Sequence, residues 1–201
     1  MKTLRPIVLA TASQSRRQLL AAAGVAFDAI ASDVDESVIK TASKAAGASV
    51  GETALELARA KAASVQADRP DALVIGADQM LDLDGAWFDK PVDMAAAHRQ
   101  LSALRGRPHA LHSAVTLFGP EGEVWSHVAT AVLVMRPFSD AFLAGYLDAV
   151  GEDALKSVGG YFLEGVGVQL FERVDGDFFT ILGLPMTPLL SALRAAGALS
   201  E

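Results

Sequence analysis

One carboxylate in this chain stands directly at the end of a strongly apolar run. Asp78 follows Leu-Val-Ile-Gly-Ala at residues 73–77, a pattern that predicts a buried strand. In α/β proteins, functional residues collect at the carboxyl ends of strands and in the loops that follow them. A helix cap or a turn is the ordinary role for such an aspartate, but hydrophobic residues at 80–81 follow it here instead of a helix. We therefore expect Asp78 to face a cleft and to act chemically.

A cluster of hydroxyl and guanidinium groups follows the first apolar run. Ser13 and Arg16 belong to Ser-Gln-Ser-Arg-Arg, which lies between a predicted strand at 6–10 and a predicted helix at 16–23. The hydroxyls and free backbone N–H groups of such a segment could receive a phosphate, with an arginine closing over it. The alternative is a capping serine followed by two solvated arginines.

Three acidic residues stand close together after a second predicted strand at 27–31. Asp33, Asp35 and Glu36 could contribute to a site for a hard divalent cation. Mg²⁺ in particular binds one or two carboxylates together with substrate phosphate oxygens and water. The alternative is a solvated acidic loop, which is common in a protein of this charge.

Two lysines could neutralise phosphate groups. Lys61 lies on an alanine-rich helical face, from which a long side chain can reach outward. Lys90 precedes Pro91, which holds it in extended geometry. Both could equally be ordinary surface residues, and the four histidines show no spacing typical of metal ligands on one element.

Composition excludes several classes of protein. The 201 residues contain no cysteine, which removes thiol nucleophiles, Cys-ligated zinc, iron–sulfur clusters and disulfides. The formal net charge of −7 argues against a partner such as nucleic acid or an anionic membrane. Phosphate-loop, nucleophile-elbow and His-Glu-x-x-His motifs are also missing.

The sequence predicts a cytoplasmic protein. The longest charge-free stretch near the C-terminus, residues 178–193, is interrupted by Gly183, Pro185 and Pro188. It also falls short of the roughly 20 apolar residues that a spanning helix needs. The apolar run near the N-terminus is too short for a secretory signal.

Hydrophobic periodicity predicts an α/β protein with a mixed sheet. Strand, helix and strand alternate in the first part of the chain, and a helix at 55–65 precedes the buried strand at 73–77. Residues 38–51 are rich in Ala, Ser and Gly and are interpreted as a surface connection or a weak helix. The later part contains runs typical of antiparallel strands. We expect such strands at 111–118 and 124–135, a hairpin of 166–174 with 178–182, and helices at 93–104, 140–150 and from 185 onward.

Six short motifs occur in a fixed order along nearly the whole chain. They are residues 9–20 (LATASQSRRQLL), 34–36 (VDE), 57–62 (LARAKA), 76–79 (GADQ), 89–91 (DKP) and 183–185 (GLP). In order and spacing they resemble the Maf family of nucleoside triphosphate pyrophosphatases. The resemblance implies an α/β fold shared with the inosine triphosphatase superfamily. That fold is an elongated, two-lobed mixed β-sheet with flanking helices and a nucleotide cleft between the lobes, here a single Maf-like domain over residues 1–201.

The resemblance also implies an activity. Such an enzyme hydrolyses a nucleoside triphosphate to the monophosphate and pyrophosphate, with Mg²⁺ or another divalent cation such as Mn²⁺. Asp78 matches the catalytic carboxylate, which accepts a proton from the attacking water and contributes to the metal site, and Asp35 matches the acid that helps to hold the metal. The positions that bind phosphate are matched by Ser13, Arg16, Lys61 and Lys90.

Two positions resemble the subfamily that acts on 7-methyl-GTP. Gln79 follows the catalytic aspartate, and Glu164 lies in Tyr-Phe-Leu-Glu-Gly, whereas relatives that prefer dTTP and UTP carry Thr and Gln there. A carboxylate suits the N–H donors of guanine and a base made cationic by methylation. Ser15 matches neither subfamily, because one carries Trp there and the other Arg, and Gln14 replaces the usual Pro. The dTTP/UTP enzyme therefore remains the alternative.

The resemblance also bears on partners and on cellular role. It makes a homodimer plausible and implies house-cleaning of the nucleotide pool. Because the family name is associated with septum formation, a non-catalytic nucleotide-binding regulator of cell division is a further alternative.

Overall fold

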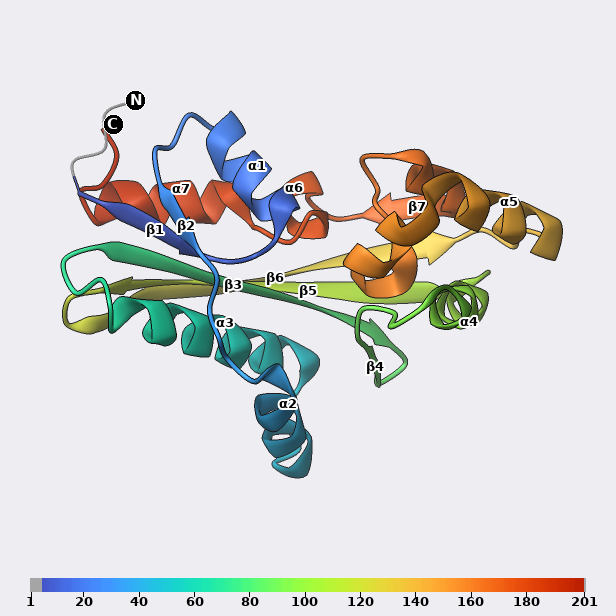
Figure 1. The fold of residues 1–201 in the computed structure, drawn as a ribbon, viewed down its shortest axis with the longest axis horizontal. Helices are drawn as coiled ribbons and strands as arrows, with labels where there is room; N and C mark the ends of the chain where they lie inside the picture. The colour runs from blue at the N-terminus through green and yellow to red at the C-terminus, as the bar shows by residue number, and fades with distance from the viewer. Residues whose placement is uncertain (1–4, 201) are drawn as a thin grey trace. The chain divides into compact units, whose positions relative to one another are not determined.

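The computed structural model describes residues 5–200, which form a mixed seven-stranded β-sheet with helices beside it (Figure 1). The predicted domain spans 1–201, so residues 1–4 and 201 lie outside the described residues. The strands are β1 (Ile7–Ala10), β2 (Asp28–Ile30), β3 (Leu73–Leu83), β4 (Ala86–Phe88), β5 (Pro108–Gly119), β6 (Gly122–Met135) and β7 (Phe171–Asp175).

Strand pairing confirms the predicted α/β class with a mixed sheet. The strand order is β2-β1-β3-β5-β6-β7, and β4 pairs with β3 outside this path. β1 pairs in parallel with both β2 and β3, while β3 with β4 and β6 with β7 pair in antiparallel fashion. All four residues of β1 are buried, as is typical of a parallel strand covered on both faces.

Helices connect these strands. The α-helices are α1 (Gln14–Ala22), α2 (Glu36–Ala45), α3 (Val50–Gln66), α4 (Met94–Leu104), α5 (Asp140–Val150), α6 (Phe178–Ile181) and α7 (Met186–Ala195). Short 3₁₀ helices follow α5: η1 (Gly151–Lys156), η2 (Val158–Gly160) and η3 (Val166–Leu170). Within residues 5–200, none of these helices is long and apolar enough to cross a membrane.

The chain divides into two compact units. Unit 1 contains the described residues up to 79, residues 113–129 and the described residues from 178 onward. Unit 2 contains residues 80–112 and 130–177. The long strands β3, β5 and β6 therefore each contribute one segment to unit 1 and another to unit 2.

In unit 1, α3 packs closely against β3. Ser49 and Glu52 form a capping box that begins the helix, because each side chain accepts a hydrogen bond from the other residue's backbone N–H. Buried residues recur along one face of α3, including Leu57 and Ala58. Gly76 of β3 lies beneath this face, and a Cβ atom there would stand 2.1 Å from the carbonyl oxygen of Ala58. The absence of a side chain at Gly76 therefore permits the close approach of α3 to β3.

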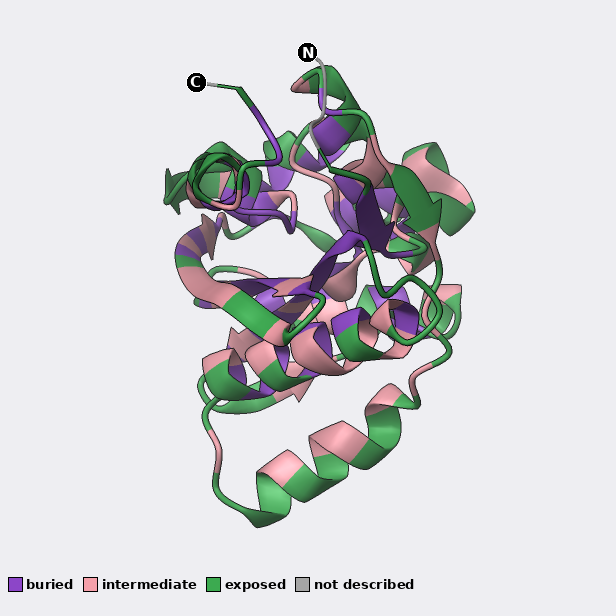
Figure 2. Ribbon diagram, turned by 90° about the vertical axis from the view of Figure 1, so that its left-hand side faces the viewer, coloured by how far each residue is buried: buried purple, intermediate pink, exposed green. Residues whose placement is uncertain are grey.

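Residues 36–45, interpreted from the sequence as an acidic loop followed by a surface connection or weak helix, form the regular helix α2. Asp35 caps it by accepting a hydrogen bond from the backbone N–H of Ser37. None of its residues is buried, and Figure 2 shows this helix in pink and green alone. Good capping and an amphipathic pattern therefore form a helix here without a fully buried face.

The predicted hairpin of 166–174 with 178–182 is wrong. Residues 166–170 form η3, β7 pairs with β6, and residues 178–181 form the single helical turn α6. Gly176, at φ +151°, follows β7 and lies very close to β6. A Cβ atom added there would stand 2.5 Å from Ala131 Cβ. The apolar pattern of 178–182 fits a strand equally well, but tertiary contacts of the α6 carbonyl groups select a helical turn.

Unit 2 contains a buried polar pair among aromatic rings. His109 Nε2 lies 2.7 Å from the hydroxyl oxygen of Tyr161, and both residues are buried. The rings of Tyr161 and Phe171 meet edge to face with centroids 4.9 Å apart. Burial lowers the pKa of His109 to about 4, so the imidazole is neutral in the native protein at neutral pH.

The contact at Gly76 predicts a large loss of stability for Gly76→Ala. The new methyl group would overlap the Ala58 carbonyl oxygen and lie 2.8 Å from Ala62 Cβ, so α3 must move away from β3. We expect the free energy of unfolding, measured by urea denaturation, to fall by about 3 kcal/mol. Gly145→Ala in α5 is the matched control, because nothing lies within 4 Å of its added Cβ, and it should stabilise by about 0.5–1 kcal/mol. Equal stability of the two variants would contradict the close packing.

The buried His109 predicts a specific pH dependence of stability. Below about pH 6.5 the unfolded chain binds a proton at this histidine, whereas the native protein does so only near pH 4. Stability therefore falls as the pH is lowered from about 6.5 to about 4, by about 3 kcal/mol from this group, and levels off below. Urea denaturation of His109→Gln should show a shallower loss over this range than the wild type. Identical slopes in the two proteins would exclude this contribution.

Candidate functional site

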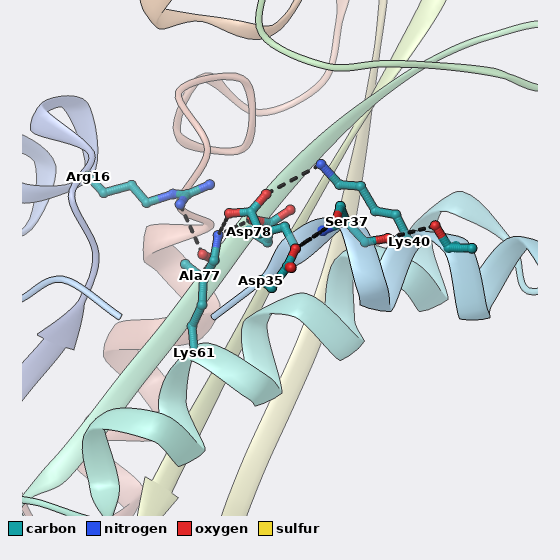
Figure 3. Close-up of polar contacts among 9 residues, drawn as sticks. Arg16, Asp35, Ser37, Lys40, Lys61, Ala77 and Asp78 are labelled. Carbon is teal, nitrogen blue, oxygen red and sulfur yellow. Dashed lines mark hydrogen bonds and ion pairs between the residues drawn. The ribbon is translucent and has the colours of Figure 1, made fainter. Parts of the chain in front are cut away.

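A buried carboxylate and a lysine form the centre of the candidate site. Asp78 belongs to the part of β3 in unit 1 and is only 5% exposed. Lys61, from the facing surface of α3, places its Nζ 2.5 Å from Asp78 Oδ1 (Figure 3). Because a buried charge requires a partner, this ion pair explains how Asp78 is accommodated. The surface alternative for Lys61 is wrong, since its side chain is 12% exposed.

The same lysine contacts a second carboxylate. Glu36, the first residue of α2, places Oε1 2.6 Å from Lys61 Nζ. Its other oxygen lies 3.3 Å from Nζ of Lys40, one helical turn later. Partial burial opposes ionisation of Glu36, but the hydrogen bond and charge of Lys61, together with Lys40, outweigh it and lower the pKa of this carboxyl. Glu36 is therefore a carboxylate anion at neutral pH.

Arg16 is fixed by backbone carbonyl groups. Its Nε donates to the carbonyl oxygen of Gly183 at 2.8 Å, and its Nη1 donates to that of Ala77 at 2.9 Å. Burial lowers the pKa of the guanidinium, while the negative charges of Asp78 and Glu36 act in the opposite direction. Arginine remains protonated in such a setting, so the residue supplies a fixed positive charge next to Asp78.

Ser13 caps the helix that carries Arg16. Its Oγ accepts a hydrogen bond from the Arg16 backbone N–H at 3.5 Å, and its own N–H donates to Thr11 Oγ1 at 3.1 Å. The capping role is thus confirmed, but the arginines are not simply solvated. Arg16 is buried, and Arg17 donates to the Thr11 carbonyl oxygen at 2.9 Å. This loop is ordered by its own polar groups.

Asp35 lies beside the cluster in sequence, but its hydrogen bonds are local. Its Oδ1 accepts hydrogen bonds from the N–H and the Oγ of Ser37, at 3.0 and 2.6 Å. The hydrogen bonds from Ser37 lower the pKa of this exposed carboxyl. The acid that contacts Lys61 is Glu36, which the sequence interpretation named with Asp33 and Asp35 as a candidate ligand of a divalent cation. The preference of Asp for helix caps could have shown that Asp35 precedes the helix and Glu36 opens it.

Gln79 is held by the segment that forms α6. Its Nε2 lies 2.9 Å from Ser113 Oγ, 3.1 Å from the Thr180 carbonyl oxygen and 2.9 Å from the Ile181 carbonyl oxygen. Ser113 Oγ donates to the same Thr180 oxygen at 2.7 Å, so it can accept from Gln79. With the amide nitrogen committed to these acceptors, the Gln79 oxygen is the group left to accept from a ligand.

Two predicted site residues belong to unit 2. Lys90 is exposed and follows β4, and Glu164 is exposed in the turn between η2 and η3. That turn is tightly built, because a Cβ atom at Gly167 would lie 2.4 Å from the Phe162 carbonyl oxygen. The structure thus brings together Arg16, Lys61 and Asp78 within unit 1, with Ser13 and Gln79 adjoining them in the chain.

The donor set of the cluster fits a hard divalent cation. Among residues 5–200 there is no group of three or more His, Asp or Glu side chains that could hold a metal on its own. Mg²⁺ does not need one, because it binds one or two carboxylates with substrate phosphate oxygens and water. Asp78 and Glu36, joined through the same ammonium group, provide two such carboxylates. The positive charges of Arg16 and Lys61 would complement phosphate oxygens.

Comparison with known proteins gives a consistent result. The family model described as "Maf-like protein" matches residues 6–196. A protein of Rhizobium meliloti (strain 1021) named 7-methyl-GTP pyrophosphatase is 51% identical over 96% of this chain and 97% of its own. A protein of Paramagnetospirillum magneticum (strain ATCC 700264 / AMB-1) named nucleoside triphosphate pyrophosphatase is 50% identical over 96% of this chain and 99% of its own. Since the match covers nearly the whole chain, this protein belongs to the Maf family.

Proposed function

We propose that this protein hydrolyses a nucleoside triphosphate to the monophosphate and pyrophosphate with the help of a divalent cation. The single observation that carries the proposal is the ion-paired cluster of Asp78, Lys61 and Glu36 beside the fixed Arg16. Relatives that are about half identical over nearly the full chain are named as pyrophosphatases of this kind, which supports it.

Each member of the cluster suits one requirement of attack at the α-phosphorus. Asp78 orients the attacking water and accepts its proton. Lys61 and Arg16 neutralise charge that develops on the phosphate oxygens, and Ser13 presents the hydroxyl and N–H groups of its loop to a phosphate. Asp78 and Glu36 would hold Mg²⁺ or Mn²⁺, which when bound supplies further neutralisation of the phosphate oxygens. Lys90 is proposed as an additional phosphate ligand.

The substrate that these residues favour is 7-methyl-GTP. The Gln79 oxygen, left free by the contacts of the amide nitrogen, can accept an N–H of the guanine edge. Glu164, exposed on its tight turn, would add a negative charge suited to a base made cationic by methylation. The 7-methyl-GTP name of several relatives supports this choice, and dTTP or UTP is the alternative.

A substrate panel tests the proposal. Pyrophosphate release is measured for 7-methyl-GTP, GTP, dTTP, UTP and CTP, with Mg²⁺ and with chelator. We expect 7-methyl-GTP to have the highest kcat/KM, by about tenfold or more over GTP because an acceptor and a carboxylate address the methylated base, and we expect no turnover with chelator. Preference for dTTP or UTP would overturn the base assignment alone. Failure to cleave any of the five would overturn the activity.

Asp78→Asn is the control for this panel. The amide keeps the size of the side chain but cannot accept a proton from water, so kcat should fall by about 10³-fold or more. Circular dichroism and urea denaturation establish that the variant is folded. A folded variant with wild-type turnover would remove Asp78 from its proposed role.

The contacts of the two neighbouring acids predict different results for their amides. Glu36→Gln removes a carboxylate that contacts Lys61, and we expect about a hundredfold loss of activity at limiting Mg²⁺. Asp35→Asn keeps the helix cap, since Asn caps as well as Asp, and should change activity by less than about threefold. Pyrophosphate release as a function of Mg²⁺ concentration compares them. The reverse order would assign the metal role to Asp35.

A further inference from the structure

Without substrate, Lys61 lies between the two carboxylates of the candidate site. Its Nζ is 2.5 Å from Asp78 Oδ1 and 2.6 Å from Glu36 Oε1. Figure 3 shows the Lys61 side chain reaching up from α3 toward Asp78. The side chains of Lys61 and Asp78 are 12% and 8% exposed, so water screens this contact poorly. Both distances are those of strong, charge-assisted hydrogen bonds.

This arrangement conflicts with the role proposed for Lys61 in the reaction. An ammonium group has three N–H donors, and two of them are directed at carboxylates here. Only one is left for a phosphate oxygen. The two carboxylates that would hold a divalent cation are at the same time already neutralised by a cation that the protein itself supplies.

We propose that Lys61 is an exchangeable internal counter-ion that must leave Asp78 and Glu36 before a divalent cation can bind them, and that the incoming triphosphate receives its ammonium group. This inference rests on the proposed function and adds to it that the binding of the cation and the binding of the nucleotide depend on each other. Cation and nucleotide therefore bind synergistically. The cation replaces Lys61 as the partner of the two carboxylates, and the triphosphate replaces the carboxylates as the partner of Lys61.

The reason for the dependence is electrostatic. A cation that binds alone forces the poorly solvated ammonium of Lys61 to leave both of its anionic partners, and an unpaired buried charge is costly. A triphosphate that binds with the cation provides new anionic partners and removes that cost. The same coupling must act in both directions, so the cation strengthens nucleotide binding by the same factor.

Of the two poorly exposed cations, Lys61 is the one suited to exchange. Arg16 donates to the carbonyl oxygens of Gly183 and Ala77, which belong to the backbone and cannot follow a moving side chain. The contacts of Lys61 are to side chains alone in this cluster, and its ammonium stands on a flexible four-carbon stem. The structure thus separates a fixed positive charge from a movable one.

Mn²⁺ binding to the full-length protein tests the proposal without any turnover. Electron paramagnetic resonance measures the free Mn²⁺ signal in titrations of nucleotide-free protein. We expect weak binding by the wild type and at least about tenfold tighter binding by Lys61→Gln, because two carboxylates then lack their internal counter-ion. Lys61→Arg, which keeps the charge, should bind Mn²⁺ as weakly as the wild type.

Lys44→Gln is the matched control for net charge. It removes one positive charge from the exposed last turn of α2, and it should change Mn²⁺ affinity by less than about twofold because the charge of an exposed side chain is screened by the solvent. Circular dichroism checks that each variant is folded. If Lys61→Gln binds Mn²⁺ no more tightly than Lys44→Gln, the proposal is overturned.

A second measurement uses the wild type alone, so that it does not depend on the folding of a variant. Calorimetry measures binding of the α,β-methylene analogue of 7-methyl-GTP, which cannot release pyrophosphate, with Mn²⁺ and with chelator. We expect at least about tenfold tighter binding with Mn²⁺. Tight Mn²⁺ binding by the nucleotide-free wild type would overturn the exchange. The proposed function would still stand if the protein releases pyrophosphate in the substrate panel. An analogue affinity that is the same with Mn²⁺ and with chelator would overturn both the exchange and the metal dependence.

Discussion

The burial of the Asp78 carboxylate is the constraint on which the arrangement of unit 1 depends. An ionised carboxylate that is 5% exposed needs opposite charge and hydrogen bonds in its immediate surroundings. Lys61 meets this need only if α3 lies close to β3, and Gly76 permits that approach because it carries no side chain. The close packing of α3 on β3 therefore also places the ion pair of Lys61 and Asp78.

Backbone carbonyl groups near α6 tie distant parts of unit 1 to the same place. Arg16 and Gly183 are 167 positions apart in the sequence, yet the arginine donates to that glycine's carbonyl oxygen. Gln79 donates in the same way to the carbonyl oxygens of Thr180 and Ile181. These carbonyl groups face the interior, where an unpaired acceptor would be costly. Arg16 and Gln79 thus supply hydrogen-bond donors to carbonyl groups in and just after α6, and these carbonyl groups in turn orient the two side chains.

The sequence predicted those features that depend on local pattern. The run before Asp78 indicates a buried strand, and the helical spacing before Pro70 indicates α3. The two elements that carry Asp78 and Lys61 could therefore be predicted. The contact of Glu36 with Lys61 could not be predicted, because it depends on the residue at which α2 begins. The hairpin expected near Phe178 failed because contacts of Gln79 with distant carbonyl groups outweigh local strand propensity. The role of Glu164 was suggested by family resemblance alone, and that of Lys90 also by its position before Pro91. Both roles stay predictions.

The alternation of charge in the cluster bears on how the proposed triphosphate would bind there. Positive and negative groups follow one another from Arg16 through Asp78, Lys61 and Glu36 to Lys40. Every inner charge already has opposite neighbours, which is the favourable arrangement for the poorly exposed Asp78 and Lys61. A ligand with several negative charges has little favourable electrostatic interaction with such a series of paired charges unless some of the ion pairs separate. A site that is stable when empty and receptive to phosphate therefore needs at least one movable cation, and the lysine between two carboxylates meets this condition better than the backbone-anchored arginine.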